Sequence, residues 1–145
     1  MRDSVQHTVL LVDNNPTDVF LFQRAIRKSH TGISLQRVEN TEEAIKYLQG
    51  EGVYADRECY PFPSLLLTDL RMPCLNGLEL LAWIKQQQHL KSLPVVVMSG
   101  SEEPRAVERT KALGAVAYYA KPSRLYELEE IFQNILSYLS PSQSE

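Results

Sequence analysis

The chain has 145 residues, a length that fits one domain with a continuous hydrophobic core rather than two domains. Apolar residues make up 43% of it and charged residues 23%, which is typical of a globular domain and excludes a fibrous or disordered chain. The formal net charge is -3, so the chain lacks the basic excess that marks proteins binding a nucleic acid backbone, and we expect no nucleic-acid partner.

The two cysteines, Cys59 and Cys74, match neither a CxxC redox pair nor a zinc ligand spacing. No apolar run is long enough for a signal peptide or a membrane span, so we expect a cytoplasmic protein with no membrane contact. We predict a single domain over residues 1–145, with a core from about 8 to 139, a short tail at 141–145 and no output domain.

The first predicted unit is a strand followed by a helix. Val9–Val12 is an apolar run, which indicates a buried strand, and Asp13–Pro16 stops it with turn-forming residues. Asn15 is a plausible N-cap with Pro16 at the first helical position, and an amphipathic pattern then continues to near Gly32.

The second unit repeats this order. Ile33–Val38 alternates apolar and polar residues, as a half-exposed strand does. The run Asn40-Thr41-Glu42-Glu43 then opens a predicted helix that continues through Leu48 and closes at Gly50.

Three further units follow a segment at 51–64 that is rich in turn-forming and aromatic residues. The predicted pairs of strand and helix are Leu65–Asp69 with about 78–88, Val95–Met98 with about 103–113, and Ala115–Ala120 with about 125–139. Parallel strands need crossover connections, which helices provide. The alternation therefore predicts an α/β fold, with a mostly parallel five-stranded sheet covered by helices on both faces.

Four polar residues stand at the carboxyl ends of four predicted strands. Asp13 follows the first strand, Asp69 the third, Ser99 the fourth and Lys121 the fifth. In an open α/β sheet these ends line one crevice, where ligands bind. Two close carboxylates repel each other unless a cation lies between them, and oxygen ligands suit Mg²⁺. Asp69 can then act as a nucleophile toward a phosphoryl group, with the metal and Lys121 neutralising the phosphoryl oxygens.

The sequence resembles the receiver domains of two-component response regulators over about Thr8–Leu139. The segments that carry the resemblance are Asp13-Asn14, Leu67–Pro73, Asn76–Glu79, Ser99-Gly100 and Lys121-Pro122. It implies a flavodoxin-like, doubly wound sheet of five parallel strands in the order 2-1-3-4-5, with five helices. The long segment at 51–64 and the Asn15-Pro16 opening are similar to those of the stand-alone receivers that serve bacterial phytochrome kinases.

The resemblance also implies the roles of the site residues. Asp69 would be the phosphoacceptor, phosphorylated by a sensor histidine kinase or a phosphotransfer protein. Lys121 and Ser99 would bind the phosphoryl group, and Ser99 and Tyr118 would form the switch. Output would pass to a downstream protein or a second copy through the face of the fourth helix, fifth strand and fifth helix. The peptide bond between Lys121 and Pro122 is expected to be cis, as it usually is in receivers.

The implied Mg²⁺ site has Asp13, Asp69, the backbone carbonyl of Arg71 and Asn14 as its ligands. Receivers usually have two adjacent acidic residues after the first strand, so Asn14 removes one charge. That charge is worth a gross effect of roughly 4 kcal/mol at contact distance, much of it offset by desolvation. We therefore expect weakened Mg²⁺ binding and less repulsion on Asp69, with Lys121 partly holding the site when metal is absent.

Several alternatives stay open at this point. Asn14 is either an amide ligand or a turn residue, and if the metal site has lost its function the chain is a pseudo-receiver, a binding adaptor that works without phosphorylation. Tyr118 is either a switch residue or a core aromatic. The last predicted helix has an apolar stripe, which indicates first of all a core face. The alternative is that part of this stripe is a dimer or partner surface. The stripe consists of Leu125, Leu128, Phe132, Ile135 and Leu139, widened by Ile131 and Leu136.

Two other classes of α/β protein lack their signatures here. A haloacid-dehalogenase-type phosphatase would have a second Asp two positions after its nucleophile, where this chain has Arg71. A flavodoxin would have a Ser/Thr-rich phosphate loop after the first strand, where this chain has Asp13–Pro16. We therefore expect a signalling protein with at most slow self-dephosphorylation, not a metabolic enzyme.

Overall fold

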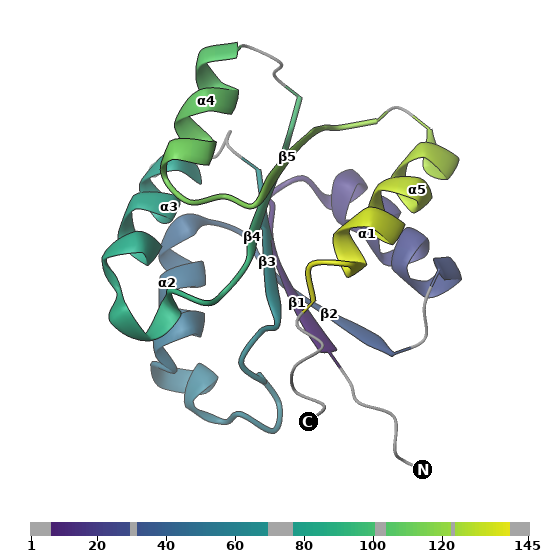
Figure 1. The fold of residues 1–145 in the computed structure, drawn as a ribbon. Helices are drawn as coiled ribbons and strands as arrows, with labels where there is room; N and C mark the ends of the chain where they lie inside the picture. The colour runs from purple at the N-terminus through teal and green to yellow at the C-terminus, as the bar shows by residue number, and fades with distance from the viewer. Residues whose placement is uncertain (1–6, 30–31, 70–76, 101–103, 123, 140–145) are drawn as a thin grey trace.

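The structure is a computed structural model that describes residues 7–29, 32–69, 77–100, 104–122 and 124–139. Within these ranges five strands form one sheet, and every neighbouring pair is parallel. The strand order is β2-β1-β3-β4-β5, which confirms the predicted order (Figure 1). The strands are β1 (His7–Val12), β2 (Ile33–Val38), β3 (Leu65–Thr68), β4 (Val95–Ser99) and β5 (Ala117–Ala120).

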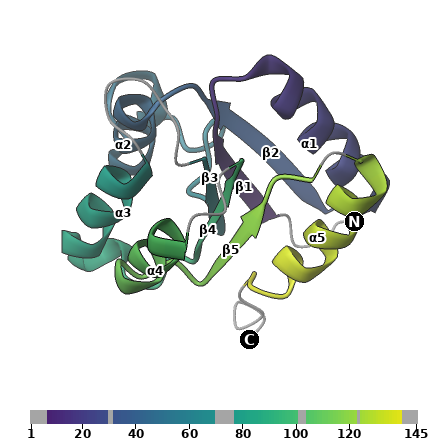
Figure 2. The same cartoon turned by 90° about the horizontal axis from the view of Figure 1, so that it is seen from above.

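Helices cover both faces of the sheet, as predicted. Seen from above, α1 and α5 lie side by side on one face, whereas α2, α3 and α4 cover the other (Figure 2). The helices are α1 (Pro16–Ser29), α2 (Thr41–Gln49), α3 (Gly77–Gln86), α4 (Pro104–Ala112) and α5 (Leu125–Leu136), with two short 3-10 helices, η1 (Gly52–Ala55) and η2 (Gln88–Leu90). The arrangement is the flavodoxin-like fold.

The central strands are buried from both sides, which explains their continuous apolar sequences. Every residue of β3 and β4 is buried, whereas the edge strands β2 and β5 are mostly half-buried. Successive side chains of a strand point to opposite faces. Val9 and Leu11 of β1 accordingly pack in one core cluster, while Leu10 and Val12 pack in the other.

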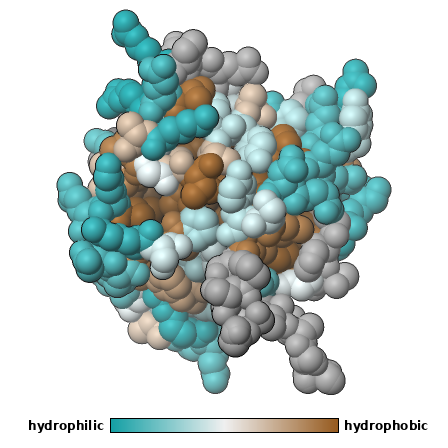
Figure 3. Space-filling model, in the orientation of Figure 1, coloured by the Kyte–Doolittle hydropathy of each residue, from teal (hydrophilic) through white to brown (hydrophobic). Residues whose placement is uncertain are grey.

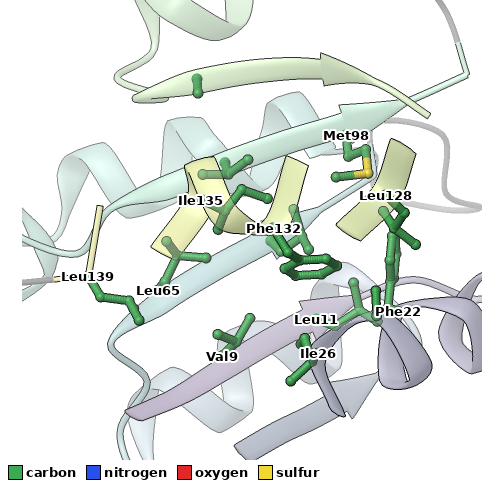
Figure 4. Close-up of a cluster of buried hydrophobic side chains, with 14 of the residues drawn as sticks. Val9, Leu11, Phe22, Ile26, Leu65, Met98, Leu128, Phe132, Ile135 and Leu139 are labelled. Carbon is green, nitrogen blue, oxygen red and sulfur yellow. The ribbon is translucent and has the colours of Figure 1, made fainter. Parts of the chain in front are cut away.

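The first core cluster lies between the sheet and the helices α1 and α5 (Figure 4). Phe22 of α1 and Phe132 of α5 meet edge to face, with ring centroids 5.8 Å apart. The predicted apolar stripe of α5 is confirmed as a core face, because Leu128, Phe132, Ile135 and Leu139 are buried. Ile131 and Leu136 pack against the same cluster, so they widen the core face.

The helix α5 ends at Leu136, three residues before the predicted end at Leu139. Beyond it, the amide of Ser137 donates to the carbonyl of Asn134, and the amide of Leu139 donates to the carbonyl of Leu136. Such bonds over three residues tighten a last turn and use up its carbonyls, so the helix stops although the apolar spacing continues.

The segment after α2 packs as an aromatic cluster on that helix. Asn40 caps α2 by accepting a hydrogen bond from the Glu43 amide, and Gly50 ends it with a φ of 70°, where a side chain would be strained. The rings of Tyr47, Tyr54 and Tyr60 then lie with centroids 5.0 to 5.9 Å apart. The 51–64 segment is therefore part of the packed domain rather than a simple connection.

The face shown in Figure 3 has hydrophilic residues around its rim and apolar residues visible between them. Of the helices within the described ranges, none combines the length and the apolar character that crossing a membrane demands.

Candidate functional site

Asp13 is held rigidly at the carboxyl end of β1. Its side chain is only 1% exposed, and its backbone amide donates to the carbonyl of Val38, which continues the pairing of β1 with β2. One carboxylate oxygen accepts a hydrogen bond of 2.9 Å from the amide of Asn15, and the Asp13 carbonyl accepts one of 3.0 Å from the Arg37 guanidinium. These contacts fix the carboxylate in one place.

Asp69 stands at the same edge, directly after β3. Its amide donates to the carbonyl of Val12 at 3.2 Å, so the last residues of β1 and β3 are in register. Its side chain is 10% exposed. The strands therefore bring Asp13 and Asp69 together although 56 positions separate them, as the strand-end argument predicts.

Lys121 reaches this acidic pair from the end of β5. Its amide donates to the carbonyl of Ser99 at 2.9 Å, which ties the end of β5 to the end of β4. Its ammonium Nζ lies 2.7 Å from a carboxylate oxygen of Asp69 and 3.3 Å from one of Asp13. The convergence of Asp13, Asp69 and Lys121 is thus present in the structure.

A third carboxylate, Asp18, belongs to the same cluster and was missed by the sequence reasoning. It lies in the first turn of α1, and its Oδ2 is 2.5 Å from the Lys121 Nζ. The side chain of Asn15 accepts hydrogen bonds from the amides of Thr17 and Asp18, which confirms the predicted cap and sets the start of the helix. An acidic residue in a first helical turn usually indicates only a favourable helix-dipole contact. The available signal was that this helix starts at the edge where the strands end.

The electrostatics of the cluster follow from its burial and its charges. Burial raises the pKa of Asp13 above its usual value; the Asn15 amide and Lys121 act against this, and the nearby carboxylates act with it. Burial alone would lower the pKa of Lys121, but hydrogen bonds to Asp18 and Asp69 and the surrounding negative charge outweigh it and raise the pKa. Lys121 therefore stays protonated between the carboxylates.

The donor set of the cluster fits a divalent cation. Asp13, Asp18 and Asp69 each offer a carboxylate oxygen, and these atoms all lie within 4.8 Å of one another. Hard oxygen donors at this spacing are the ligands that Mg²⁺ and related cations prefer. Asn14, beside Asp13, is exposed, and Arg71 lies outside the described residues, so its predicted carbonyl ligand is not described.

The two predicted switch residues occupy neighbouring strands. Ser99 is the last residue of β4 and is fully buried. Tyr118 on β5 lies opposite Val97 in the register, is half-buried, and packs against the core cluster under α2, α3 and α4. The tyrosine therefore has core contacts, and its position at the edge strand leaves the switch interpretation as a prediction.

One expectation about the backbone is wrong. Within the ranges that the structure describes no peptide bond is cis, so the bond between Lys121 and Pro122 is trans. The trans form of a bond to proline is favoured by about 0.5–1 kcal/mol unless the surroundings select the cis form.

Comparisons with known proteins agree with this fold. The family model described as "Response regulator receiver domain" matches residues 9–133. The chain is 34% identical over 130 residues to the response regulator Rcp1 of Synechocystis sp., which covers 90% of this chain and 86% of Rcp1. It is 32% identical over 127 residues to the two-component response regulator ARR16 of Arabidopsis thaliana, covering 85% of this chain and 76% of ARR16.

Two similar solved structures are those of the response regulators RcpA and Rcp1. The phosphorylated cyanobacterial phytochrome response regulator RcpA superposes with a TM-score of 0.84 at 32% identity, covering 95% of this chain and 96% of RcpA. The Mn²⁺-bound form of Rcp1 has a TM-score of 0.80 at 33% identity, covering 93% and 96%. On the family match and these relatives together, the chain belongs to the response regulator receiver domains of two-component systems.

Proposed function

We propose that the chain is a phosphorylation switch in which Asp69 receives a phosphoryl group from a sensor histidine kinase or a phosphotransfer protein. The observation that carries the proposal is the position of the Asp69 carboxylate. It is 10% exposed and lies 2.7 Å from the Lys121 ammonium, at the edge where the ends of β1, β3 and β5 meet. A carboxylate nucleophile toward phosphorus needs this kind of fixed position beside a cation.

The proposed reaction is a phosphoryl transfer. An Asp69 oxygen attacks the phosphorus of a phosphohistidine, forming a P–O bond while the P–N bond breaks. The imidazole leaves with the bonding electrons and takes up a proton. Lys121 already contacts Asp69 and would neutralise a phosphoryl oxygen, and the Ser99 hydroxyl at the end of β4 would donate to another. The product is an acyl phosphate on Asp69, with slow self-dephosphorylation by water.

The implied cofactor is Mg²⁺, which when bound would neutralise charge on the phosphoryl oxygens and help to orient the group. The carboxylates of Asp13 and Asp69 fit it in chemistry and in spacing. The carbonyl of Arg71 and the side chain of Asn14 are proposed as further ligands, as the family resemblance implies. Because an amide at position 14 carries no charge, we expect Mg²⁺ to bind more weakly than it would to an Asn14→Asp variant.

The proposed output is a change in the surface formed by α4, β5 and α5. Ser99 would move toward the phosphoryl group and the Tyr118 ring would follow, shifting the population of that face. Tyr118 packs against the same core cluster as Leu113, the residue that directly follows α4. A downstream protein or a second copy of the chain would bind the changed face.

The similarity to RcpA, described as a phytochrome response regulator, supports a phytochrome-type kinase as the donor. Such an exchange would take place in the cytoplasm, which is the compartment that we propose.

A second candidate function is favoured by Asn14 alone. If the missing charge abolishes cation binding, the chain is a pseudo-receiver that binds its partner without phosphorylation. The fold and the partner-binding face would be the same, and Asp69 would not be modified.

Intact-mass spectrometry after incubation with acetyl phosphate, over a series of Mg²⁺ concentrations, separates these two functions. We expect the gain of one phosphoryl group that needs the cation and is lost in Asp69→Asn. Asp56→Asn is the matched control, because Asp56 is an exposed aspartate outside the acidic cluster. If the folded protein gains no phosphoryl group at any Mg²⁺ concentration, while another receiver is labelled under the same conditions, the phosphorylation switch is rejected in favour of the adaptor.

A further inference from the structure

Asp18 occupies a place in the site that the receiver resemblance does not account for. It comes from the first turn of α1 rather than from the end of a strand, and it is not part of the segments that carry the resemblance. Its side chain is 24% exposed, compared with 1% for Asp13 and 10% for Asp69. It is therefore the most exposed of the three carboxylates, and we call it the outer carboxylate.

The ammonium of Lys121 is closest to this outer carboxylate. Its Nζ lies 2.5 Å from Asp18, 2.7 Å from Asp69 and 3.3 Å from Asp13. A divalent cation bound by Asp13 and Asp69 would have to compete with the ammonium for these two carboxylates. The ammonium can keep its contact with Asp18 when Asp13 and Asp69 bind a cation instead.

The charges of the cluster point in the same direction. Among the residues of the site that the structure describes, Asp13, Asp18 and Asp69 outnumber Lys121 by two charges, and without Asp18 the excess would be a single charge. Asn14 contributes no charge beside Asp13. A site with a single excess negative charge attracts a divalent cation much less strongly than a site with two.

We propose that Asp18 is the third carboxylate of the phosphoacceptor site: it holds Lys121 and supplies the negative charge that Asn14 lacks, so that cation affinity depends on it. The inference rests on the proposed function, because it takes the cation site to be the one beside Asp69. The charge that receivers usually place next to Asp13 would here come from the first turn of α1.

Removing the Asp18 charge has two effects, and both lower the affinity of the site for a cation. The site loses attraction for a cation, and Lys121 is left to pair more fully with Asp13 and Asp69, where it competes with the cation. Removing a group that orients or supports metal ligands typically lowers metal affinity by about 10–100-fold. We expect the Kd of Mn²⁺ to rise by at least about 10-fold in Asp18→Asn.

Isothermal titration of the whole chain with Mn²⁺, without any phosphodonor, tests the inference directly. The variants are Asp18→Asn, Asn14→Asp and the two combined, each checked for folding by circular dichroism. Glu42→Gln is the matched control, because Glu42 is exposed in the first turn of α2 and loses the same charge at the same kind of helix position. We expect Glu42→Gln to bind as the wild type does, and Asn14→Asp to restore most of the affinity that Asp18→Asn loses.

The inference is overturned if the Mn²⁺ affinity of folded Asp18→Asn is unchanged, if Glu42→Gln loses as much, or if Asn14→Asp restores nothing. It is also overturned if the folded wild type binds no Mn²⁺. The proposed function is tested separately, by the mass of the intact chain after incubation with a phosphodonor. If the wild type is phosphorylated and Asp18→Asn keeps full Mn²⁺ affinity, the proposed function stands and the inference about Asp18 is wrong.

Discussion

Replacing Lys121 by Met should destabilise the fold, because it leaves three neighbouring carboxylates without the cation that offsets their repulsion. Lys121 is the cation among three carboxylates whose oxygens lie within 4.8 Å of one another, and its side chain is 19% exposed. Methionine keeps much of the length of the side chain and removes the charge. Without an added cation, the variant should therefore be markedly less stable than the wild type.

The magnitude follows from the distances. A unit-charge attraction near 3 Å is worth about 5 kcal/mol at an effective dielectric of 20, before the cost of desolvation. Removing one member of a buried ion pair typically costs about 3–5 kcal/mol. Because Lys121 keeps some contact with solvent, we take the lower end, about 3 kcal/mol. For a chain of 145 residues this lowers the Tm by roughly 6–12 °C.

Thermal unfolding followed by circular dichroism in EDTA and in MgCl₂ measures the effect. Mg²⁺ should restore part of the lost stability, about 2.7 kcal/mol at a free concentration of 100 times its Kd. Lys91→Met is the control, because Lys91 is exposed and loses the same charge. If Lys121→Met melts within about 2 °C of the wild type in EDTA, the carboxylates do not need the ammonium and the electrostatic reasoning is wrong.

Three further predictions concern the core, a cap and the aromatic cluster. Phe132→Ala removes a ring that is 1% exposed and should cost about 3–5 kcal/mol in urea unfolding, and a loss below about 1 kcal/mol would contradict the packing described. Asn40→Ala removes the cap of α2 and should lower stability by about 1 kcal/mol in thermal unfolding. Burial and the hydrogen bond to Glu43 raise the pKa of Tyr54 from 10.0 to about 12. The phenol keeps its proton to a higher pH in the folded state than in the unfolded state. Its contribution to the free energy of unfolding is therefore complete below pH 10 and is lost between pH 10 and 12, at roughly 1.4 kcal/mol per pH unit. Unfolding free energies measured from pH 9 to 12 should therefore fall less steeply in Tyr54→Phe than in the wild type, and equal slopes would refute the assignment.

Much of the fold could be predicted from local patterns. The apolar runs Val9–Val12 and Val95–Met98 read as buried strands because side chains on both faces of a central parallel strand meet helices. The caps at Asn15 and Asn40 carry a side-chain oxygen that satisfies helix amides whatever the rest of the fold does. The strand-end rule then placed Asp13, Asp69 and Lys121 together.

Other features were decided by contacts between distant parts of the chain. The apolar spacing of α5 continues to Leu139, yet the helix stops at Leu136, because spacing indicates a buried face and does not determine where backbone hydrogen bonds change. In the sequence, Tyr54 and Tyr60 indicated only an aromatic-rich segment, and Tyr47 belonged to the predicted helix before it. Their packing depends on how the 51–64 segment folds back on α2.

Local patterns were enough to predict the fold class, the order of strands and helices, and the residues of the acidic pocket that the family pattern marks. That Asp18 belongs to the site follows from the packing of distant elements. Its carboxylate meets Lys121, which lies 103 positions away, because α1 starts at the edge of the sheet where β5 ends. Local patterns report the period of a helix or a strand. A charge cluster between a helix turn and a remote strand end depends on how the elements are placed in space.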